Sequence, residues 1–236
     1  MRRFILQNNI ARFRERLALE TDPCAVRTLQ GLLREAERDL VVMEAELYGA
    51  HDGPSPRLVG PPLWDAPEMA LFRKEFDAAR QMLMVIDHGP GLRIVDINRR
   101  FEDVAGVRRE DVVDRPLFEA FPDNPDESDG SGVRSLYDSL KIVLETGRPH
   151  AMEPVRYDVR DGGGRWIERW WRPVNAPLFD EHRRLAYVLQ SCEEIEAPVA
   201  TAGACPASGV GDAEPALAPA YSHPGAPGAR PRGLTI

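Results

Sequence analysis

The chain has 236 residues and a formal net charge of −8 at pH 7. Hydrophobic residues make up 43% of it and charged residues 29%, a balance that suits a water-soluble protein with a packed core. The acidic charge argues against a protein that holds nucleic acid through phosphate contacts. Apolar runs fall far short of the ~20 residues that span a bilayer. We therefore expect a cytoplasmic protein with neither a membrane nor a nucleic-acid partner.

Residues 1–48 have the pattern of two amphipathic helices joined by a tight turn. Val26, Leu29 and Leu33 begin an apolar series spaced three or four residues apart, which predicts a helix with one apolar face. Thr21-Asp22-Pro23 is a helix start signal, because the aspartate oxygen can accept an orphan backbone N–H. The sequence thus predicts a helical hairpin. Its apolar surface could cover the chain's own downstream domain or form a coiled-coil homodimer with a second copy.

Three further segments flank or connect the main domain. Residues 49–66 are rich in glycine and proline, and we expect a flexible linker there. Helical spacing resumes over 67–81, which predicts a flanking helix. Residues 197–236 are mostly Ala, Pro and Gly with almost no large apolar residues, so we expect a disordered tail. The remaining residues, 82–196, form the main domain.

Residues 82–196 combine short strands with short helices. An apolar stripe predicts a longer helix at 133–147, and Asn98 is a candidate N-cap for the first short helix. The predicted order is strands at 82–87 and 92–97, helices at 99–104, 109–113, 116–121 and 133–147, then strands at 150–160, 165–179 and 184–192. This order predicts an α+β fold in which a five-stranded antiparallel sheet carries short helices on one face.

Metal-binding patterns are weak in this sequence. Residues 122–132 contain four acidic side chains, but they lack the central glycine and the final bidentate glutamate of an EF-hand loop. That favours a solvated acidic loop over a calcium site. The three cysteines and five histidines lack zinc-site spacing. We expect no metal site, and we expect the histidines to be exposed to solvent.

Catalytic motifs are equally weak. The glycine-rich Asp161–Arg165 lacks the Lys-Ser/Thr of a phosphate-binding loop and lies between two predicted strands, which favours a hairpin turn. Ser135, Ser139 and Ser191 have no nucleophile-elbow context. We therefore expect no catalytic residues and no enzyme activity.

Several local strings occur in an order typical of one known family. Asp96-Ile97-Asn98 passes from strand to helix at an asparagine. Residues 116–125 read PLFEAFPDNP, and residues 169–177 read RWWRPVNAP. Together these strings resemble the PAS family, in particular a bacterial subgroup often found ahead of histidine-kinase cores. The resemblance covers about half of the chain. The N-terminal hairpin also resembles a helical segment that accompanies such domains in bacteria.

The resemblance implies a possible ligand cavity between the sheet and the middle helices. The candidate lining residues are Phe101, Phe121, Leu136, Leu140, Val155, Tyr157 and Trp171. The alternative is that they form ordinary packed core, which is the commoner case for any one such residue. Flavin-binding relatives use a cysteine on the middle helix, and haem-binding relatives use an axial histidine on the long helix. Residues 116–121 lack the first and residues 133–147 lack the second, so both cofactors are disfavoured and the ligand stays unknown.

The resemblance also implies a role in signal transduction. We expect a sensor or adaptor that acts as a homodimer and contacts a histidine kinase or response regulator of a two-component system. The last predicted strand runs into Glu193–Pro198, and the proline disfavours a continuous output helix, so we expect no output domain. The alternatives are a ligand-free structural module for protein–protein interaction and a truncated relative of a sensor histidine kinase.

Overall fold

The computed structural model describes residues 1–51, 63–124, 132–160, 164–180 and 182–198. The fold is α+β, with an antiparallel sheet preceded by two N-terminal helices, as the sequence predicts. The helices are α1 (Arg2–Leu19), α2 (Pro23–Tyr48), the 3-10 helices η1 (Leu63–Asp65) and η2 (Pro67–Met69), α3 (Ala70–Ala78), α4 (Arg99–Ala105), α5 (Arg109–Val112), α6 (Leu117–Ala120) and α7 (Gly132–Thr146). The strands are β1 (Met82–Ile86), β2 (Ile94–Ile97), β3 (His150–Ala151), β4 (Val155–Arg156), β5 (Val159–Arg160), β6 (Trp166–Ile167), β7 (Trp170–Phe179) and β8 (Leu185–Ile195).

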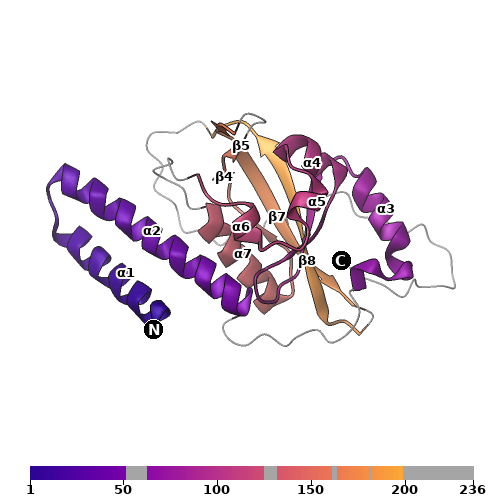
Figure 1. Cartoon of the computed structure of the whole chain (residues 1–236), viewed down its shortest axis with the longest axis horizontal. Coiled ribbons are helices and arrows are strands. Elements are labelled where there is room, and N and C mark those ends of the chain that lie inside the picture. Colours follow the sequence, from indigo (N-terminus) through magenta and orange to yellow (C-terminus); the bar gives the residue numbers. More distant parts are fainter. Residues whose placement is uncertain (52–62, 125–131, 161–163, 181, 199–236) are drawn as a thin grey trace, which may run out of the picture.

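The N-terminal hairpin consists of α1 and α2, which lie side by side and project away from the sheet (Figure 1). Asp22 is the N-cap of α2: its carboxylate accepts the Ala25 backbone N–H at 2.9 Å, and Pro23 opens the helix. Ile10 of α1 and Leu29 of α2 are buried. The predicted pair of helices is therefore present, and its turn uses the predicted cap.

The main sheet has the order β2-β1-β8-β7-β3, and its neighbouring strands are antiparallel. Both β3 and β4 pair with β7 on the side away from β8. They therefore occupy the fifth position together, so the sheet has six strands in five positions where the sequence predicts five strands. The long β7–β8 pair places Pro173 opposite Cys192 and Asn175 opposite Gln190. Residues opposite one another share a face of the sheet.

The prediction of one continuous strand at 150–160 is wrong, because the structure divides it into β3, β4 and β5. Pro154 lies in the break and has no N–H for a strand ladder. Beyond it, Val159 pairs with Ile167 of β6 in a separate two-stranded sheet. β7 accordingly begins at Trp170 and not at residue 165.

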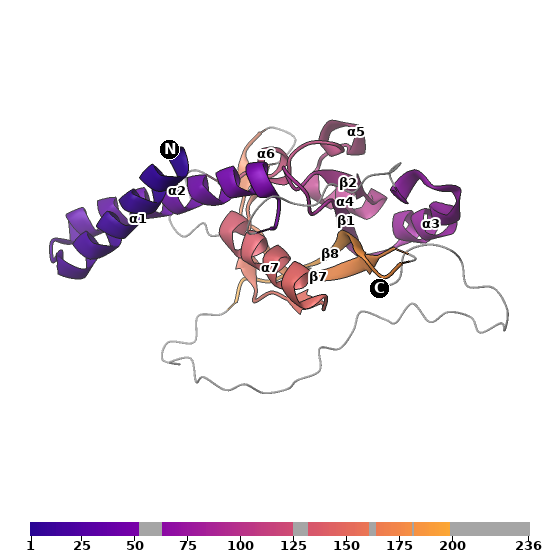
Figure 2. The same ribbon diagram turned by 90° about the horizontal axis from the view of Figure 1, so that it is seen from below.

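Different elements cover the two faces of the sheet (Figure 2). Alternate residues of β1 point to opposite faces, as a pleated strand requires. Met82, Met84 and Ile86 belong to an inner cluster with α4, α6, α7 and the end of α2. Leu83 and Val85 belong to an outer cluster, whose buried members are Trp64, Met69, Phe76, Leu83, Val85, Leu178, Ala186, Tyr187 and Leu189.

Asn98 joins the flanking segment to the domain. Its buried side-chain amide donates to the carbonyls of Phe76 at 3.1 Å and Gln81 at 2.8 Å. Its oxygen accepts the backbone N–H groups of Leu83 and Phe101, both at 3.0 Å. The bond from Phe101 is the predicted N-cap of α4. This one side chain therefore ties the end of α3 to both β1 and α4.

Parts of four predicted segments lie outside the described residues. These parts are residues 52–62 of the linker, 125–131 of the acidic loop, 161–163 of the glycine-rich turn and 199–236 of the C-terminal segment. Within the described ranges, no helix combines the length and the apolar character needed to cross a membrane.

Candidate ligand-binding site

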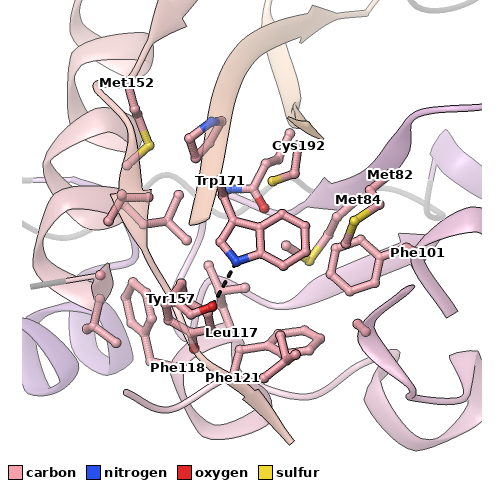
Figure 3. A pocket seen from close by; sticks show the side chains of 18 residues that line it. Met82, Met84, Phe101, Leu117, Phe118, Phe121, Met152, Tyr157, Trp171 and Cys192 are labelled. Atoms are coloured by element: carbon pink, nitrogen blue, oxygen red, sulfur yellow. Dashed lines mark hydrogen bonds between the residues drawn. The ribbon is translucent and has the colours of Figure 1, made fainter. Parts of the chain in front are cut away.

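A cavity of about 90 Å³ lies between the inner face of the sheet and helices α4, α6 and α7 (Figure 3). All of the lining residues lie within the main domain, residues 82–196. The lining consists of Met82, Met84, Phe101, Ala105, Leu117, Phe118, Phe121, Gly132, Val133, Leu136, Met152, Val155, Tyr157, Val159, Trp171, Pro173, Gln190 and Cys192. Aromatic, aliphatic and sulfur-containing side chains therefore dominate its surface.

The structure brings six of the seven candidate residues to this cavity. They are Phe101, Phe121, Leu136, Val155, Tyr157 and Trp171. Leu140 is fully buried in the inner cluster but does not line the cavity, because it lies one turn further along α7 than Leu136. That these residues bind a ligand stays a prediction.

Sequence reasoning missed the methionines, the glycine and the polar residues of the lining. The β1 alternation could have identified Met82 and Met84, because a buried strand sends every second side chain to the same face. Gly132 had no such signal. A Cβ atom there would lie 2.5 Å from the Tyr157 ring, so the glycine allows that ring to lie against the start of α7.

The indole of Trp171 and the hydroxyl of Tyr157 form hydrogen bonds within the cavity wall. The Trp171 indole N–H donates to the Tyr157 carbonyl at 2.8 Å, which is the dashed line in Figure 3. The Tyr157 hydroxyl donates to the Pro122 carbonyl at 3.1 Å. Burial raises the pKa of Tyr157 well above its ordinary value, so the phenol stays protonated and able to donate. These groups hold the wall together.

The cavity carries no formal charge on its lining. None of the 18 residues that surround it is an Asp, Glu, Lys, Arg or His. Burial raises the pKa of the Cys192 thiol to about 12. A thiol with that pKa is neutral at pH 7 and is a poor nucleophile. The site is therefore suited to holding a neutral molecule.

The helical hairpin docks beside the cavity through main-chain contacts. The Gly91 N–H donates to the Ala45 carbonyl at 2.8 Å, and the Ala50 N–H donates to the His88 carbonyl at 3.1 Å. Gly49 has φ = 66°, and a Cβ atom there would lie 2.2 Å from the carbonyl oxygens of His88 and Gly89. Only glycine permits this approach. The end of α2 is therefore fitted to the turn between β1 and β2.

The expectation that all five histidines are exposed to solvent is wrong for His51 and His150, which are half-buried, and above all for His88. It is buried at this docking site, with its Nδ1 atom 2.9 Å from His51 Nε2 and its Nε2 atom 3.2 Å from the Leu185 carbonyl. Burial lowers the pKa of His88, which favours the neutral ring. Its position on a turn gave no sign of this burial, which depends on the distant Leu185.

Comparison with known proteins identifies the family. Residues 76–200, more than half of the chain, match the family described as PAS fold. The chain belongs to the PAS family, whose members are sensor modules of signal transduction. A comparison with curated proteins gives no match.

Solved structures similar to this chain include three bacterial examples. The PAS domain of a protein from Colwellia psychrerythraea is 16% identical, with a TM-score of 0.41, over 54% of this chain and 96% of that one. The PAS domain of Bordetella pertussis BvgS is 20% identical, with a TM-score of 0.41, over 56% and 90%. A Rhodobacter sphaeroides LOV protein is 17% identical, with a TM-score of 0.42, over 58% and 73%. At such identities the likeness concerns the fold alone.

Proposed function

We propose that this PAS protein is a sensor or adaptor that dimerises through α1 and α2 and passes a signal to a separate partner. A histidine kinase or response regulator of a two-component system is the kind of partner we propose. The signal is the binding of a small molecule in the inner cavity. The observation that carries this proposal is the position of α7, which contacts both the cavity and the hairpin.

Adjacent residues of α7 serve the two contacts. Gly132, Val133 and Leu136 line the cavity. Tyr137, the next residue, is buried and donates its hydroxyl to the Gly49 carbonyl at 3.2 Å. Because protein interiors are close-packed, a molecule that displaces α7 also displaces Tyr137. Ligand occupancy would thereby change how the hairpin docks.

The hairpin also exposes apolar surface that supports self-association. Phe4 and Ile5 on α1 are 66% and 50% exposed, and Leu47 near the end of α2 is 54% exposed. Clustered exposed apolar side chains on a helix often mark a site of protein–protein contact. We propose that the same surface of a second copy covers them.

The oligomeric state tests the dimer part of this proposal. Size-exclusion chromatography with light scattering should give a dimer for the full chain and a monomer for the double variant Phe4→Ser with Ile5→Ser. Leu71→Ser is the matched control, because Leu71 is equally exposed at 67% but lies on α3. A monomeric wild type, or a dimeric double variant, contradicts the proposed interface.

Native mass spectrometry of the full chain, purified from its own host, tests the ligand part. A small additional mass that persists in the wild type and is lost from a variant with a filled cavity, Leu136→Phe, supports a sensor. A bare wild-type mass under the same conditions contradicts ligand sensing. That result would favour the alternative of a structural interaction module with no ligand.

A further inference from the structure

Two primary amides lie side by side on the inner face of the sheet. Asn175 of β7 and Gln190 of β8 are directly opposite one another in the strand register, so their side chains share a face. Asn175 is fully buried, and Gln190 is only 5% exposed. Gln190 lines the cavity, whereas Asn175 contacts the lining residue Met152. Amides at such positions normally complete their hydrogen bonds within the protein.

The hydrogen bonding of both amides is incomplete. The Asn175 Nδ2 atom donates to the Ser139 hydroxyl at 2.7 Å and lies 3.5 Å from the Met152 sulfur. The Asn175 Oδ1 atom has no hydrogen-bond partner among the described residues. Exchanging the two ends of this amide would leave its NH₂ group unsatisfied instead. Within the same described ranges, the side chain of Gln190 makes no hydrogen bond.

Unsatisfied amides are costly in an apolar interior. A buried amide atom without a partner loses its bond to water on folding, as the Asn175 Oδ1 atom does, whereas a leucine or methionine of similar size would carry no such penalty. Asn175 and Gln190 on adjacent strands, the second of them on the cavity wall, form a polar end in a site that is otherwise apolar. That arrangement is what a site needs to orient a ligand by one polar group.

We propose that Gln190, supported by Asn175, is the hydrogen-bonding anchor for a small, neutral and mostly apolar molecule that carries a single amide-like polar group. This inference rests on the proposed function, in which the cavity holds a ligand. Gln190 contacts the polar group directly. Asn175 contacts the Met152 sulfur, and it completes the polar end when that flexible side chain moves aside.

The lining fixes the charge and size of this molecule. A charged ligand would be buried without a countercharge, because none of the lining residues carries one. The cavity of about 90 Å³ is smaller than the ~150 Å³ of an apolar cavity that holds benzene. Met82, Met84 and Met152 can yield to enlarge it. We therefore expect a ligand no larger than about one six-membered ring with one substituent.

Three probes of this size test the inference on the full chain. Benzamide carries the amide, toluene lacks it, and benzoate replaces it with a charge. Titration calorimetry should show that the wild type binds benzamide about tenfold more tightly than toluene, the usual effect of one good hydrogen bond, and does not bind benzoate. In Gln190→Met, benzamide should lose this advantage while toluene binding is kept.

Two further variants control the experiment. Ser191→Ala changes the adjacent residue, which does not line the cavity, and should keep the wild-type preference. Gln190→Leu is a second test should methionine disturb the packing. Both Gln190 variants should keep the midpoint of thermal unfolding, because the Gln190 side chain makes no hydrogen bond within the described residues that the substitution would remove. A lowered midpoint with an unchanged probe preference would show that Gln190 is structural only.

The outcomes separate this inference from the proposed function. Equal binding of benzamide and toluene to the wild type overturns the amide anchor and leaves the ligand cavity standing. Benzoate binding as tightly as benzamide overturns the requirement for a neutral ligand. Failure of all three probes to bind the wild type overturns both the anchor and the proposed ligand cavity.

Discussion

The two faces of the sheet differ in how completely their polar groups are paired. On the outer face, the Trp64 indole N–H donates to Asp96 at 2.9 Å, and the Trp64 backbone N–H donates to the Tyr187 hydroxyl at 3.3 Å. The Trp64 ring also makes edge contacts with Phe72, Phe76 and Tyr187, with ring centroids 5.8, 5.3 and 6.5 Å apart. On the inner face, Asn175 and the cavity leave packing and hydrogen bonds incomplete.

This difference indicates a division of labour between the faces. The Trp64 ring, which we call the aromatic plug, covers the outer cluster, and its polar groups are paired. We therefore expect the outer cluster to contribute mainly to stability. The inner face instead contains an uncharged cavity beside α7 and the docked hairpin, and an unfilled cavity lowers stability. Stability and binding are often in conflict within one site. Under the proposed function this conflict is reduced, because stability and ligand binding would depend on different faces of one sheet.

Removing the aromatic plug should have the largest effect. Trp64→Ala is expected to lower the free energy of unfolding by roughly 3–5 kcal/mol, because a large buried ring is replaced by a cavity and the Asp96 carboxylate loses a donor. Urea unfolding followed by circular dichroism measures this change. Leu71→Ala on α3, at a position that is 67% exposed, is the control and should stay within about 0.5 kcal/mol of wild type. A loss below about 1 kcal/mol for Trp64→Ala would mean that the outer face is not the stable one.

A matched pair of Ala→Leu substitutions compares the packing of the two faces directly. Ala186 belongs to the outer cluster and Ala105 lines the inner cavity. The same added atoms should overpack the outer cluster, so Ala186→Leu is expected to cost about 1–3 kcal/mol. They should partly fill the cavity in Ala105→Leu, for which we expect a cost below about 1 kcal/mol or a small gain.

Urea unfolding measures the loss in the free energy of unfolding for each variant, and the two losses are then compared. Equal losses would show that the inner face is packed as tightly as the outer one. That result would remove the structural basis for a ligand cavity. A larger loss in Ala105→Leu would reverse the comparison.

Local signals in the sequence predicted much of this fold. The Asp22 cap, the Asn98 cap and the helix stripes act over a few residues, so the sequence alone reveals them. The six cavity residues followed from stripes at helical and strand spacing and from the PAS resemblance. Leu140 shows the limit of that reasoning, because a stripe tells which side of a helix is buried but not where a cavity lies along it.

Long-range contacts account for what the sequence could not predict. Trp64 falls in the segment predicted to be a flexible linker, yet it is held by Tyr187, 123 positions further along the chain. The burial of Gln190 has the same origin, since its polarity suggests a solvated position and only the assembled sheet places it on the cavity wall. No pattern within either segment contains this information.

The smallest expected effect is a pH dependence on the outer face. Burial raises the pKa of Asp96, although the nearby Arg109 guanidinium and the hydrogen bond from Trp64 oppose this shift. A carboxyl whose pKa is higher in the folded than in the unfolded protein binds more protons when folded. Its contribution to stability is therefore greatest at acidic pH and declines as the pH rises through the window between the two pKa values.

Replacing Asp96 with asparagine isolates this contribution. The amide keeps an acceptor for the Trp64 indole but does not titrate, so the free energy of unfolding of wild type minus that of Asp96→Asn should fall as the pH rises and then level off. Urea titrations at a series of pH values measure the difference, and Asp103→Asn on the exposed side of α4 should run parallel to wild type. The sign of the change in this difference with pH shows whether burial or the ion pair with Arg109 dominates at Asp96. A difference that increases with pH would show that the ion pair with Arg109 outweighs burial, and the outer face would then depend on a charge, unlike the uncharged cavity behind it.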